Sequence, residues 1–239
     1  RECLINRQFR PTISNMNERE FKNNIYGELA KVTKAMGNPH RMEIIDLLAQ
    51  GPFPVEQIAS ATGLTIANAS QHLQTLKHAQ LVQIARNGNF ICYSLAGENV
   101  YNAWAGLREL GLLYNSGAGK VVKDFRKGFS NPETVGAEDL LRMIWKKNVI
   151  ILDVRPEEEY RRGHVHRAVS IPLEQLDNRL KSIPKSRMIV AYCRGPFCVY
   201  ADQAVALLTQ KGFNARRMTE GFPDWVQKGY PVEEMVPTN

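Results

Sequence analysis

Residues 57–77, QIASATGLTIANASQHLQTLK, decide the fold of the first half of the chain. Gly63 ends a short helix that begins at Val55, because glycine readily adopts the left-handed conformation that terminates a helix. Thr65 is the N-cap of a second helix, whose apolar side chains recur at helical spacing at Ile66, Ala69, Leu73 and Leu76. Two short helices joined by a glycine turn predict a helix-turn-helix.

Three further helices are expected around this unit. Apolar residues recur three or four positions apart from Glu18 to Met36, and Asn38 caps a helix that Gly51 ends. Helical spacing returns over 98–113. The small residues 115–119 that follow are expected to be flexible and to end this domain.

Two β-rich runs, 81–85 and 90–95, flank Asn87-Gly88. This dipeptide favours a tight hairpin, so the runs predict a wing. The second helix of a winged helix-turn-helix lies in the major groove, which is about 12 Å wide and admits one helix. The first half therefore predicts binding to double-stranded DNA.

The candidate DNA contacts lie on the outward face of the second helix. Its hydrogen-bonding side chains are expected to address base edges and phosphates, and they are Thr65, Asn68, Ser70, Gln71, His72, Gln74 and Thr75. Lys77 and Arg86 are expected to contact phosphates. His72 has two interpretations, a DNA contact or a residue that caps and packs the helix, and we favour the first.

Residues 57–65, 69–77 and 79–82 resemble the ArsR family of winged-helix repressors, and the resemblance extends over about 18–113. It implies a homodimer joined through the first and last helices, here 21–36 and 98–113. It also implies a palindromic DNA operator that is released when an inducer arrives.

No metal site is expected in this domain. The metal sensors of the ArsR family carry a Cys-x-Cys pair before the reading helix, or histidines and carboxylates on the dimer helix. Residues 53–62 contain no cysteine and residues 98–113 contain no histidine, so thiolate and imidazole ligands are missing at both places.

The second half has a different pattern, with strands expected at 149–154, 168–171 and 188–192 and helical patterns between and after them. Such alternation predicts an α/β domain with a central, mostly parallel sheet. We therefore expect two domains, a mostly-α winged helix-turn-helix and an α/β domain. The expected boundaries are a tail, native or not, at 1–15, the first domain at 16–117, a basic linker at 118–132 and the second domain at 133–239.

Cys193 directly follows the expected strand 188–192, and a helix is expected from about Val199 to Gln210. Backbone N–H groups and a helix N-terminus converge on such a loop, and they are expected to lower the pKa of the thiol. Arg194 adds a positive charge beside it. The rest of the loop is Gly195, Pro196, Phe197 and Cys198.

Residues 152–160, 163–165 and 168–172 resemble the first signature of the rhodanese superfamily, and residues 221–225 and 229–232 resemble its closing signature. The resemblance covers about 132–232. It implies a sulfurtransferase without a cofactor, in which Cys193 takes sulfane sulfur from a small donor, holds it as a persulfide and passes it to a thiol acceptor. The amides of Arg194 to Cys198 would hold the outer sulfur, while Asp153 and Arg155 would orient the loop and its entrance.

The loop departs from that family at Cys198, where many thiosulfate-using members have a basic residue. Thiosulfate is therefore in doubt as the donor. Cys198 is either a resolving thiol that attacks the Cys193 persulfide or a small side chain packed in the first helical turn. A phosphatase-like relative would need arginine six positions after Cys193, and Val199 stands there.

Together, the two halves predict a repressor in which a persulfide on Cys193 couples sulfur sensing or sulfur transfer to operator binding. One alternative is a sulfurtransferase whose winged-helix domain serves dimerisation or partner binding. Another places the sensing thiol at Cys92 on the second wing strand.

Composition adds two limits. Among 239 residues, 44% are hydrophobic and 23% charged, and no apolar run approaches the roughly 18 residues of a membrane helix, so a cytoplasmic protein is expected. The net charge is +7. Residues 16–118 contain equal numbers of basic and acidic side chains, so DNA binding is inferred from the motif, with support from the basic linker (Lys120, Lys123, Arg126, Lys127) rather than from the charge of the domain.

Overall fold

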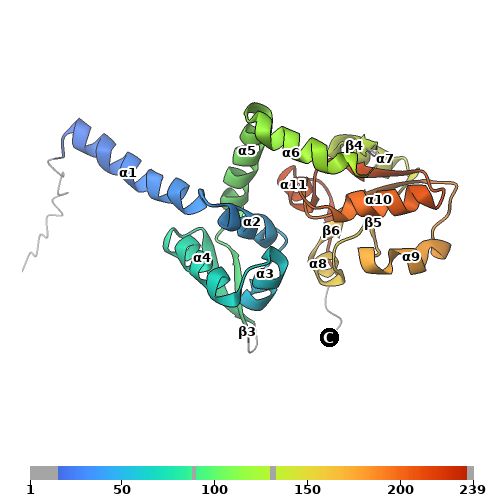
Figure 1. The fold of residues 1–239 in the computed structure, drawn as a ribbon, viewed down its shortest axis with the longest axis horizontal. Helices are drawn as coiled ribbons and strands as arrows, with labels where there is room; N and C mark the ends of the chain where they lie inside the picture. The colour runs from blue at the N-terminus through green and yellow to red at the C-terminus, as the bar shows by residue number, and fades with distance from the viewer. Residues whose placement is uncertain (1–15, 88–89, 130–132, 236–239) are drawn as a thin grey trace, which may run out of the picture.

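The computed structural model describes residues 16–87, 90–129 and 133–235. These residues form a helical N-terminal domain and an α/β C-terminal domain that pack against each other, with α1 (Glu18–Met36) projecting from the body of the molecule (Figure 1). The expected tail 1–15 and the expected hairpin turn at Gly88 lie outside the described residues.

The helix-turn-helix consists of α3 (Val55–Thr62) and α4 (Ile66–His78), as predicted. Gly63 has a φ of 67° between them, and the Thr65 hydroxyl accepts a hydrogen bond of 3.2 Å from the Asn68 amide. Preceding them, α2 (Pro39–Leu48) begins after Asn38, whose side chain accepts from the Arg41 amide. The local signals in the sequence therefore set these helix ends correctly.

The wing is β2 (Val82–Asn87) paired antiparallel with β3 (Phe90–Leu95), followed by α5 (Glu98–Tyr114). A two-residue strand, β1 (Phe53–Pro54), also pairs with β3 and was not expected from the sequence. The buried side chains of α2, α3 and α4 form the core of this domain, with Ile44, Ile45, Ile58, Leu73 and Leu76 fully covered.

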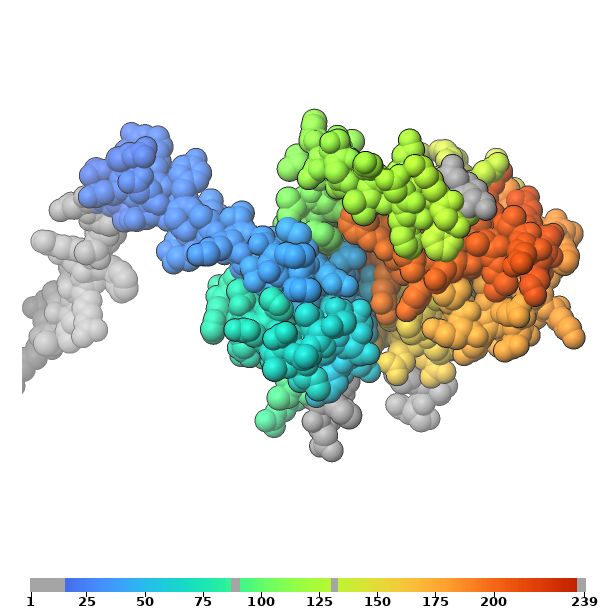
Figure 2. Space-filling model, viewed as in Figure 1, coloured from blue at the N-terminus to red at the C-terminus, as the bar shows by residue number. Residues whose placement is uncertain are grey.

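The prediction of a flexible stretch at 115–119 is wrong. Asn115 caps a twelve-residue helix, α6 (Ser116–Lys127), because its side chain accepts hydrogen bonds from the amides of Gly117 and Ala118. Helix α6 thus includes most of the expected linker. It lies across the second domain beside α10 (Tyr200–Gln210) in the space-filling view (Figure 2).

The C-terminal domain contains a five-stranded sheet in the order β4-β9-β8-β5-β7, and every pair in it is parallel. The strands are β4 (Thr134–Val135), β5 (Val149–Asp153), β7 (Val169–Ser170), β8 (Met188–Tyr192) and β9 (Ala215–Met218). A separate antiparallel pair joins β6 (His164–Val165) to β10 (Val232–Glu233).

Helices cover both faces of this sheet. One core layer contains residues of α7 (Ala137–Trp145) and α11 (Phe222–Gln227), and the other contains residues of α9 (Leu176–Arg179) and α10. Helix α8 (Glu157–Arg162) follows β5. Because the carboxyl ends of parallel strands meet at one edge, the residues after β5 and β8 come together there.

Candidate functional site

Helix α4 presents most of the predicted DNA contacts to solvent. Exposed side chains are Thr65, Asn68, Gln71, Gln74, Thr75 and Lys77, and Arg86 is exposed on β2. Ser70 is half-buried, as is His72, whose ring lies 5.4 Å from that of His40, centroid to centroid. Burial, followed by the neighbouring His40 and Arg41, lowers the pKa of His72. The exposed side chains are therefore accessible to DNA, and the role of each residue stays a prediction.

Helices α1 and α5 expose apolar side chains that a soluble monomer would normally cover. Phe21 is 57% and Leu29 54% exposed on α1, and Leu113 is 68% exposed on α5. Large apolar side chains exposed at helical spacing along one helix are typical of an interaction face. The two helices are those that the ArsR resemblance assigns to dimerisation.

The loop after β8 brings Cys193 and Cys198 together. Cys193 is only 2% exposed, and its Sγ lies 3.5 Å from the carbonyl oxygen of Cys198 and 3.9 Å from that of Gly195. The Cys198 amide donates to the Gly195 carbonyl at 3.1 Å, which closes the loop on itself. Both cysteines are free thiols.

The expectation that the loop lowers the pKa of Cys193 is wrong. Burial raises the pKa of the Cys193 thiol, and so does its hydrogen bond to Cys198. The pKa of Cys198 is instead lowered to about 7, chiefly by that same hydrogen bond from Cys193 and further by the amides of Tyr200 and Arg194. In the closed loop, the less buried thiol is therefore the one that is partly ionised at neutral pH.

Arg194 adds positive charge beside the thiols, as the sequence predicts, and this charge contributes to the lowered pKa of Cys198. Its guanidinium forms an ion pair with Glu159, with Nη2 at 2.5 Å from Oε1. The closing signature packs on the same loop, since the Phe222 amide donates to the Cys193 carbonyl at 3.1 Å. A Cβ at Gly221 would lie 2.2 Å from the Arg194 carbonyl oxygen, so only glycine fits this approach.

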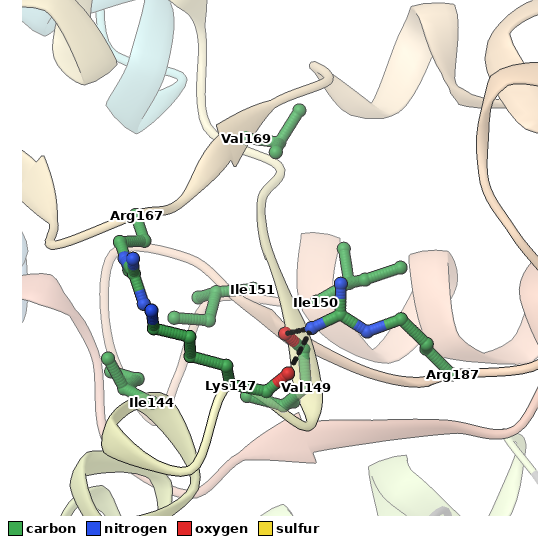
Figure 3. A pocket seen from close by; sticks show the side chains of 8 residues that line it. All are labelled: Ile144, Lys147, Val149, Ile150, Ile151, Arg167, Val169 and Arg187. Carbon is green, nitrogen blue, oxygen red and sulfur yellow. Dashed lines mark hydrogen bonds between the residues drawn. The ribbon is translucent and has the colours of Figure 1, made fainter.

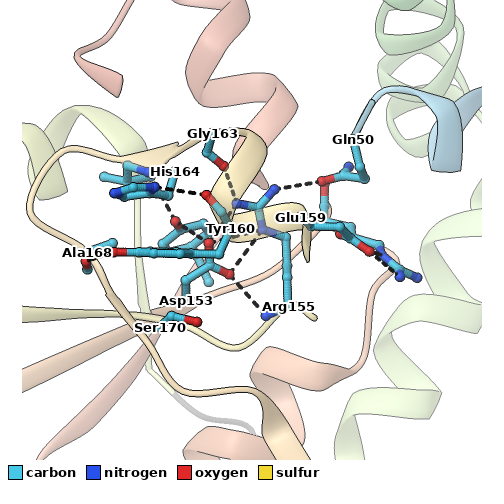
Figure 4. Close-up of polar contacts among 12 residues, drawn as sticks. Gln50, Asp153, Arg155, Glu159, Tyr160, Gly163, His164, Ala168 and Ser170 are labelled. Atoms are coloured by element: carbon cyan, nitrogen blue, oxygen red, sulfur yellow. Dashed lines mark hydrogen bonds and ion pairs between the residues drawn. The ribbon is translucent and has the colours of Figure 1, made fainter. Parts of the chain in front are cut away.

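Asp153 and Arg155 form a fully buried ion pair (Figure 4). Asp153 Oδ2 accepts from Arg155 Nη2 at 2.6 Å and from the Tyr192 hydroxyl at 2.6 Å. Arg155 Nη1 in turn donates to Gln50 Oε1 at 3.1 Å, and Gln50 lies just past α2 in the DNA-binding domain. The pair is thus part of the framework that supports the loop.

Gln50 links the two domains directly. Besides its bond from Arg155, it donates from Nε2 to the carbonyl oxygen of Arg194, at 3.1 Å. A second link joins α5 to α11, where Asp224 accepts hydrogen bonds from Tyr101 and Arg108. The loop 193–198, named the sulfur loop for the sulfur atoms of its two cysteines, is therefore hydrogen-bonded by Gln50 of the N-terminal domain.

Two cavities open beside the loop, and Phe197, Cys198 and Val199 line both. One, of about 560 Å³, lies against α2 and includes Asp46 and Trp104. The other, of about 750 Å³, lies under α6 and includes Phe125. Cys198 therefore borders both cavities, whereas Cys193 is covered.

A further cavity of about 300 Å³ lies elsewhere on the sheet (Figure 3). Its lining combines apolar side chains such as Ile144 with Lys147, Arg167 and Arg187, and Arg187 donates to the carbonyls of Lys147 and Val149. Neither Cys193 nor Cys198 lines this cavity.

His164 and His166 both lie close to the Glu233 carboxylate. His166 Nδ1 lies 2.6 Å from Glu233 Oε1, and His164 stacks on Tyr160. Among residues 16–87, 90–129 and 133–235, no group of three or more potential ligands could hold a metal ion. In the same part of the chain, no helix is both long and apolar enough to cross a membrane.

Four residues that contact the loop 193–198 or the residues packed on it could not be identified from the sequence. Gln50 carried no signal, because a glutamine after a helix is unremarkable without knowledge of its partner. Glu159 lay within the first rhodanese-like signature and Asp224 within the closing one, but their partners are distant in sequence. Arg126 was assigned to a basic linker that supports DNA binding, whereas its Nη2 donates to the carbonyl of Pro196 in the sulfur loop.

Two known families match these two halves of the chain. A helix-turn-helix domain matches residues 36–84, and a rhodanese-like domain matches residues 136–228. Together with the winged-helix geometry, they define a DNA-binding transcriptional regulator that carries a rhodanese-like domain. One relative matches this chain across both domains. The HTH-type transcriptional regulator Rv0324 of Mycobacterium tuberculosis is 38% identical over 211 residues, which are 88% of this chain and 92% of the relative. The chain belongs to this family of ArsR-type regulators with a rhodanese-like domain.

Other similar proteins match one domain each. A sulfurtransferase of Allochromatium vinosum is 30% identical over 92 residues, 38% of this chain and 84% of that protein. The homodimeric winged helix-turn-helix domain of Mb0332 from Mycobacterium bovis, a possible ArsR-family regulator, is 36% identical and covers 44% of this chain and 94% of its own, with a TM-score of 0.40.

Proposed function

We propose that this regulator carries sulfane sulfur on Cys193 and that sulfur loading changes its affinity for an operator DNA. The observation that carries the proposal is the position of Gln50, which is hydrogen-bonded to the Arg194 carbonyl in the sulfur loop and to Arg155 below it. An added sulfur atom must displace part of a loop in which Cys193 is only 2% exposed. Gln50 would transmit that displacement to α2, which packs in one core with α3 and α4.

The chemistry is thiol exchange. The Cys193 thiolate attacks the outer sulfur of a small organic persulfide R–S–SH, the S–S bond of the donor breaks, and R–S⁻ leaves with the electron pair. Cys193 then holds –S–SH. A thiolate acceptor attacks the outer sulfur in turn, takes it as its own persulfide and restores the Cys193 thiolate, so no cofactor is required.

Cys198 would act as the resolving thiol. Its pKa of about 7 makes it a partly ionised nucleophile at neutral pH, and it lies in the same short loop. Attack of its thiolate on the Cys193 sulfur of the persulfide forms a Cys193–Cys198 disulfide and releases HS⁻. The same lowered pKa argues against a purely apolar packing role for Cys198.

The DNA-binding half would act as a homodimer on a palindromic operator. The exposed apolar faces of α1 and α5 support dimerisation, and the exposed polar face of α4 supports insertion into the major groove. Cys92 is buried on β3, where it pairs with Pro54 of β1 and Ala85 of β2. This position supports a packing role for Cys92 rather than the sensing role.

Mass spectrometry of the full-length protein tests the sulfur chemistry. The reduced protein is treated with an organic persulfide donor and digested, and each cysteine is examined for added sulfur. We expect one sulfur on Cys193 or a Cys193–Cys198 disulfide in wild type, a stable persulfide in Cys198→Ser and neither product in Cys193→Ser, with Cys92→Ser as the control that behaves like wild type.

Two outcomes would overturn this proposal. Sulfur found on Cys92, with Cys193 unmodified, would move the sensing thiol to the wing. Multiple turnover of sulfur to a thiol acceptor, without a DNA complex even at low salt, would identify a sulfurtransferase whose winged-helix domain serves another purpose, because phosphate contacts strengthen as salt falls.

A further inference from the structure

Beneath the sulfur loop, two arginines share one buried carboxylate. Asp202 on α10 is 1% exposed, and its Oδ1 lies 3.3 Å from Nε of Arg217 on β9 and 3.6 Å from Nε of Arg126 on α6. Arg217 is also 1% exposed. Within the described residues, neither Asp202 Oδ1 nor Arg217 Nε has a hydrogen bond of good geometry. The three side chains form an ion cluster of two guanidinium groups and one carboxylate, which has one positive charge in excess.

The other charged groups near the loop are paired. Arg194 pairs with Glu159, and Arg155 pairs with Asp153. Tyr192 is uncharged at neutral pH, because burial raises its pKa. The surplus charge of the Asp202 cluster is therefore not cancelled by these neighbours on the sheet side of the loop.

On the side facing the DNA-binding domain, the charges have the opposite balance. Asp46 of α2 and Asp224 of α11 share Arg108 of α5, and burial raises the pKa of Asp46. Glu43 of α2 lines the same cavity as Cys198. The loop thus lies between a basic cluster beneath it and an acidic one across the interdomain cavity.

The basic cluster lies on the same face of the sheet as the thiols. Arg217 pairs in register with Ala191, and Cys193 follows Ala191 by two residues, so both side chains are on the face that α10 covers. Arg126 donates to the Pro196 carbonyl in the loop, and it lines the 750 Å³ cavity together with Cys198 and Asp202. Burial lowers the pKa of Arg217, while Asp202 and the two thiols raise it, as expected if they are close.

We propose that Arg217 and Arg126, by sharing the single carboxylate of Asp202, supply the positive charge that stabilises anionic sulfur on the loop 193–198. A buried net charge is unfavourable unless an opposite charge comes to it, and the anionic sulfur of a thiolate or persulfide is that charge. These arginines are positioning residues, acting through the field at the loop. The part concerning a persulfide rests on the proposed function, whereas the part concerning the thiolate does not.

The test is the pH profile of thiol alkylation in the reduced full-length protein, with iodoacetamide as the probe and mass spectrometry to locate the label. An opposite charge at close range typically shifts a pKa by about 1–3 units. We expect Arg217→Met and Arg126→Gln to raise the midpoint of alkylation at Cys193 and Cys198 by about one unit or more. Asp202→Asn should lower it, because both arginines would then face the thiols uncompensated.

Two controls separate this charge effect from damage to the fold. Arg217→Lys retains the charge and should restore most of the wild-type midpoint. Arg216→Met removes a neighbouring arginine on the same strand that pairs with Glu133, and should leave the midpoint unchanged. If Arg217→Met does not fold, the half-buried Arg126→Gln and Asp202→Asn must still shift the midpoint in opposite directions.

The proposal is overturned if Arg217→Met and Asp202→Asn shift the midpoint in the same direction, or if no variant shifts it. Alkylation requires no sulfur donor. A failure of the sulfur chemistry would appear in the donor experiment above and would leave this profile unaffected, so the two failures are distinguishable.

Discussion

The Tyr101 hydroxyl of α5 donates a hydrogen bond of 2.8 Å to the Asp224 carboxylate of α11, across the boundary between the two domains. The other oxygen of Asp224 accepts from the Gly221 amide at 2.9 Å, and Gly221 lies against the Arg194 carbonyl of the sulfur loop. A helix assigned to dimerisation is therefore connected to the sulfur loop through one buried carboxylate.

Asp224→Ala should destabilise the protein strongly. The substitution leaves the Arg108 guanidinium, which is nearly buried, without this partner, and breaking a buried ion pair in this way typically costs about 3–5 kcal/mol. Tyr101→Phe removes a single hydrogen bond and should cost only about 1 kcal/mol. Denaturant unfolding measures both, with Glu138→Ala as the control, because the Glu138–Arg142 ion pair is exposed. Equal stability of Asp224→Ala and wild type would show that the domains are not held together here.

Gln50→Leu should separate the two activities. Both hydrogen bonds to the sulfur domain are lost, while neither the face of α4 nor the thiols are altered. We expect DNA binding and sulfur loading to persist, with the effect of loading on DNA affinity reduced toward none. Gln203→Leu, an exposed glutamine on α10, is the matched control and should respond like wild type. A full response in Gln50→Leu would mean that coupling follows another route.

Removal of the basic residues of the reading domain should alter salt dependence more than specificity. Lys77→Ala and Arg86→Ala should each weaken binding to all DNA sequences and reduce the slope of log affinity against log salt by about one. Gln71→Ala should instead cost about 1–3 kcal/mol on the operator and much less on unrelated DNA. Fluorescence anisotropy across a salt series measures both. Lys211→Ala, in the rhodanese-like domain, is the control and should leave the slope unchanged. An equal reduction of the slope in Lys211→Ala would contradict the assignment of α4 to DNA binding.

The reactivity of the thiol pair should depend on pH with a midpoint near neutrality. The pKa of Cys198 is lowered to about 7, so the thiolate fraction and the alkylation rate should rise as pH increases through that value. Cys198→Ser removes this thiolate, and burial raises the pKa of the remaining Cys193. The midpoint of the variant should therefore move to higher pH. An unchanged midpoint in Cys198→Ser would show that the low pKa belongs to Cys193 and would contradict this prediction.

Features set by nearby residues could be predicted from the sequence. Gly63 and the cap Thr65 fixed the helix-turn-helix, and the strand before Cys193 was predicted at its observed bounds, Met188–Tyr192. These signals depend on interactions within a few residues, which a single sequence displays. The helix α6 was missed because its glycines suggested flexibility, and the side chain of Asn115 that caps it gave too weak a signal.

What the sequence could not provide depends on pairs that are distant along the chain. Gln50 and Arg194 are 144 positions apart, and no local pattern connects them. The ionisation of Cys193 was predicted in the wrong direction, because the backbone environment of the loop is visible in the sequence but the burial of the thiol is not. Arg126 was placed with DNA for the same reason, since its partners Asp202 and Pro196 come together only in the folded chain.

The most direct test of the central claim is the affinity of the full-length protein for the DNA upstream of its own gene, with and without an organic persulfide donor. Allosteric coupling typically changes affinity about 5- to 150-fold. We predict a change in this range for wild type and none for Cys193→Ser. Equal affinities for wild type in the two conditions, or the same change in Cys193→Ser, would contradict the claim that sulfur on Cys193 controls DNA binding.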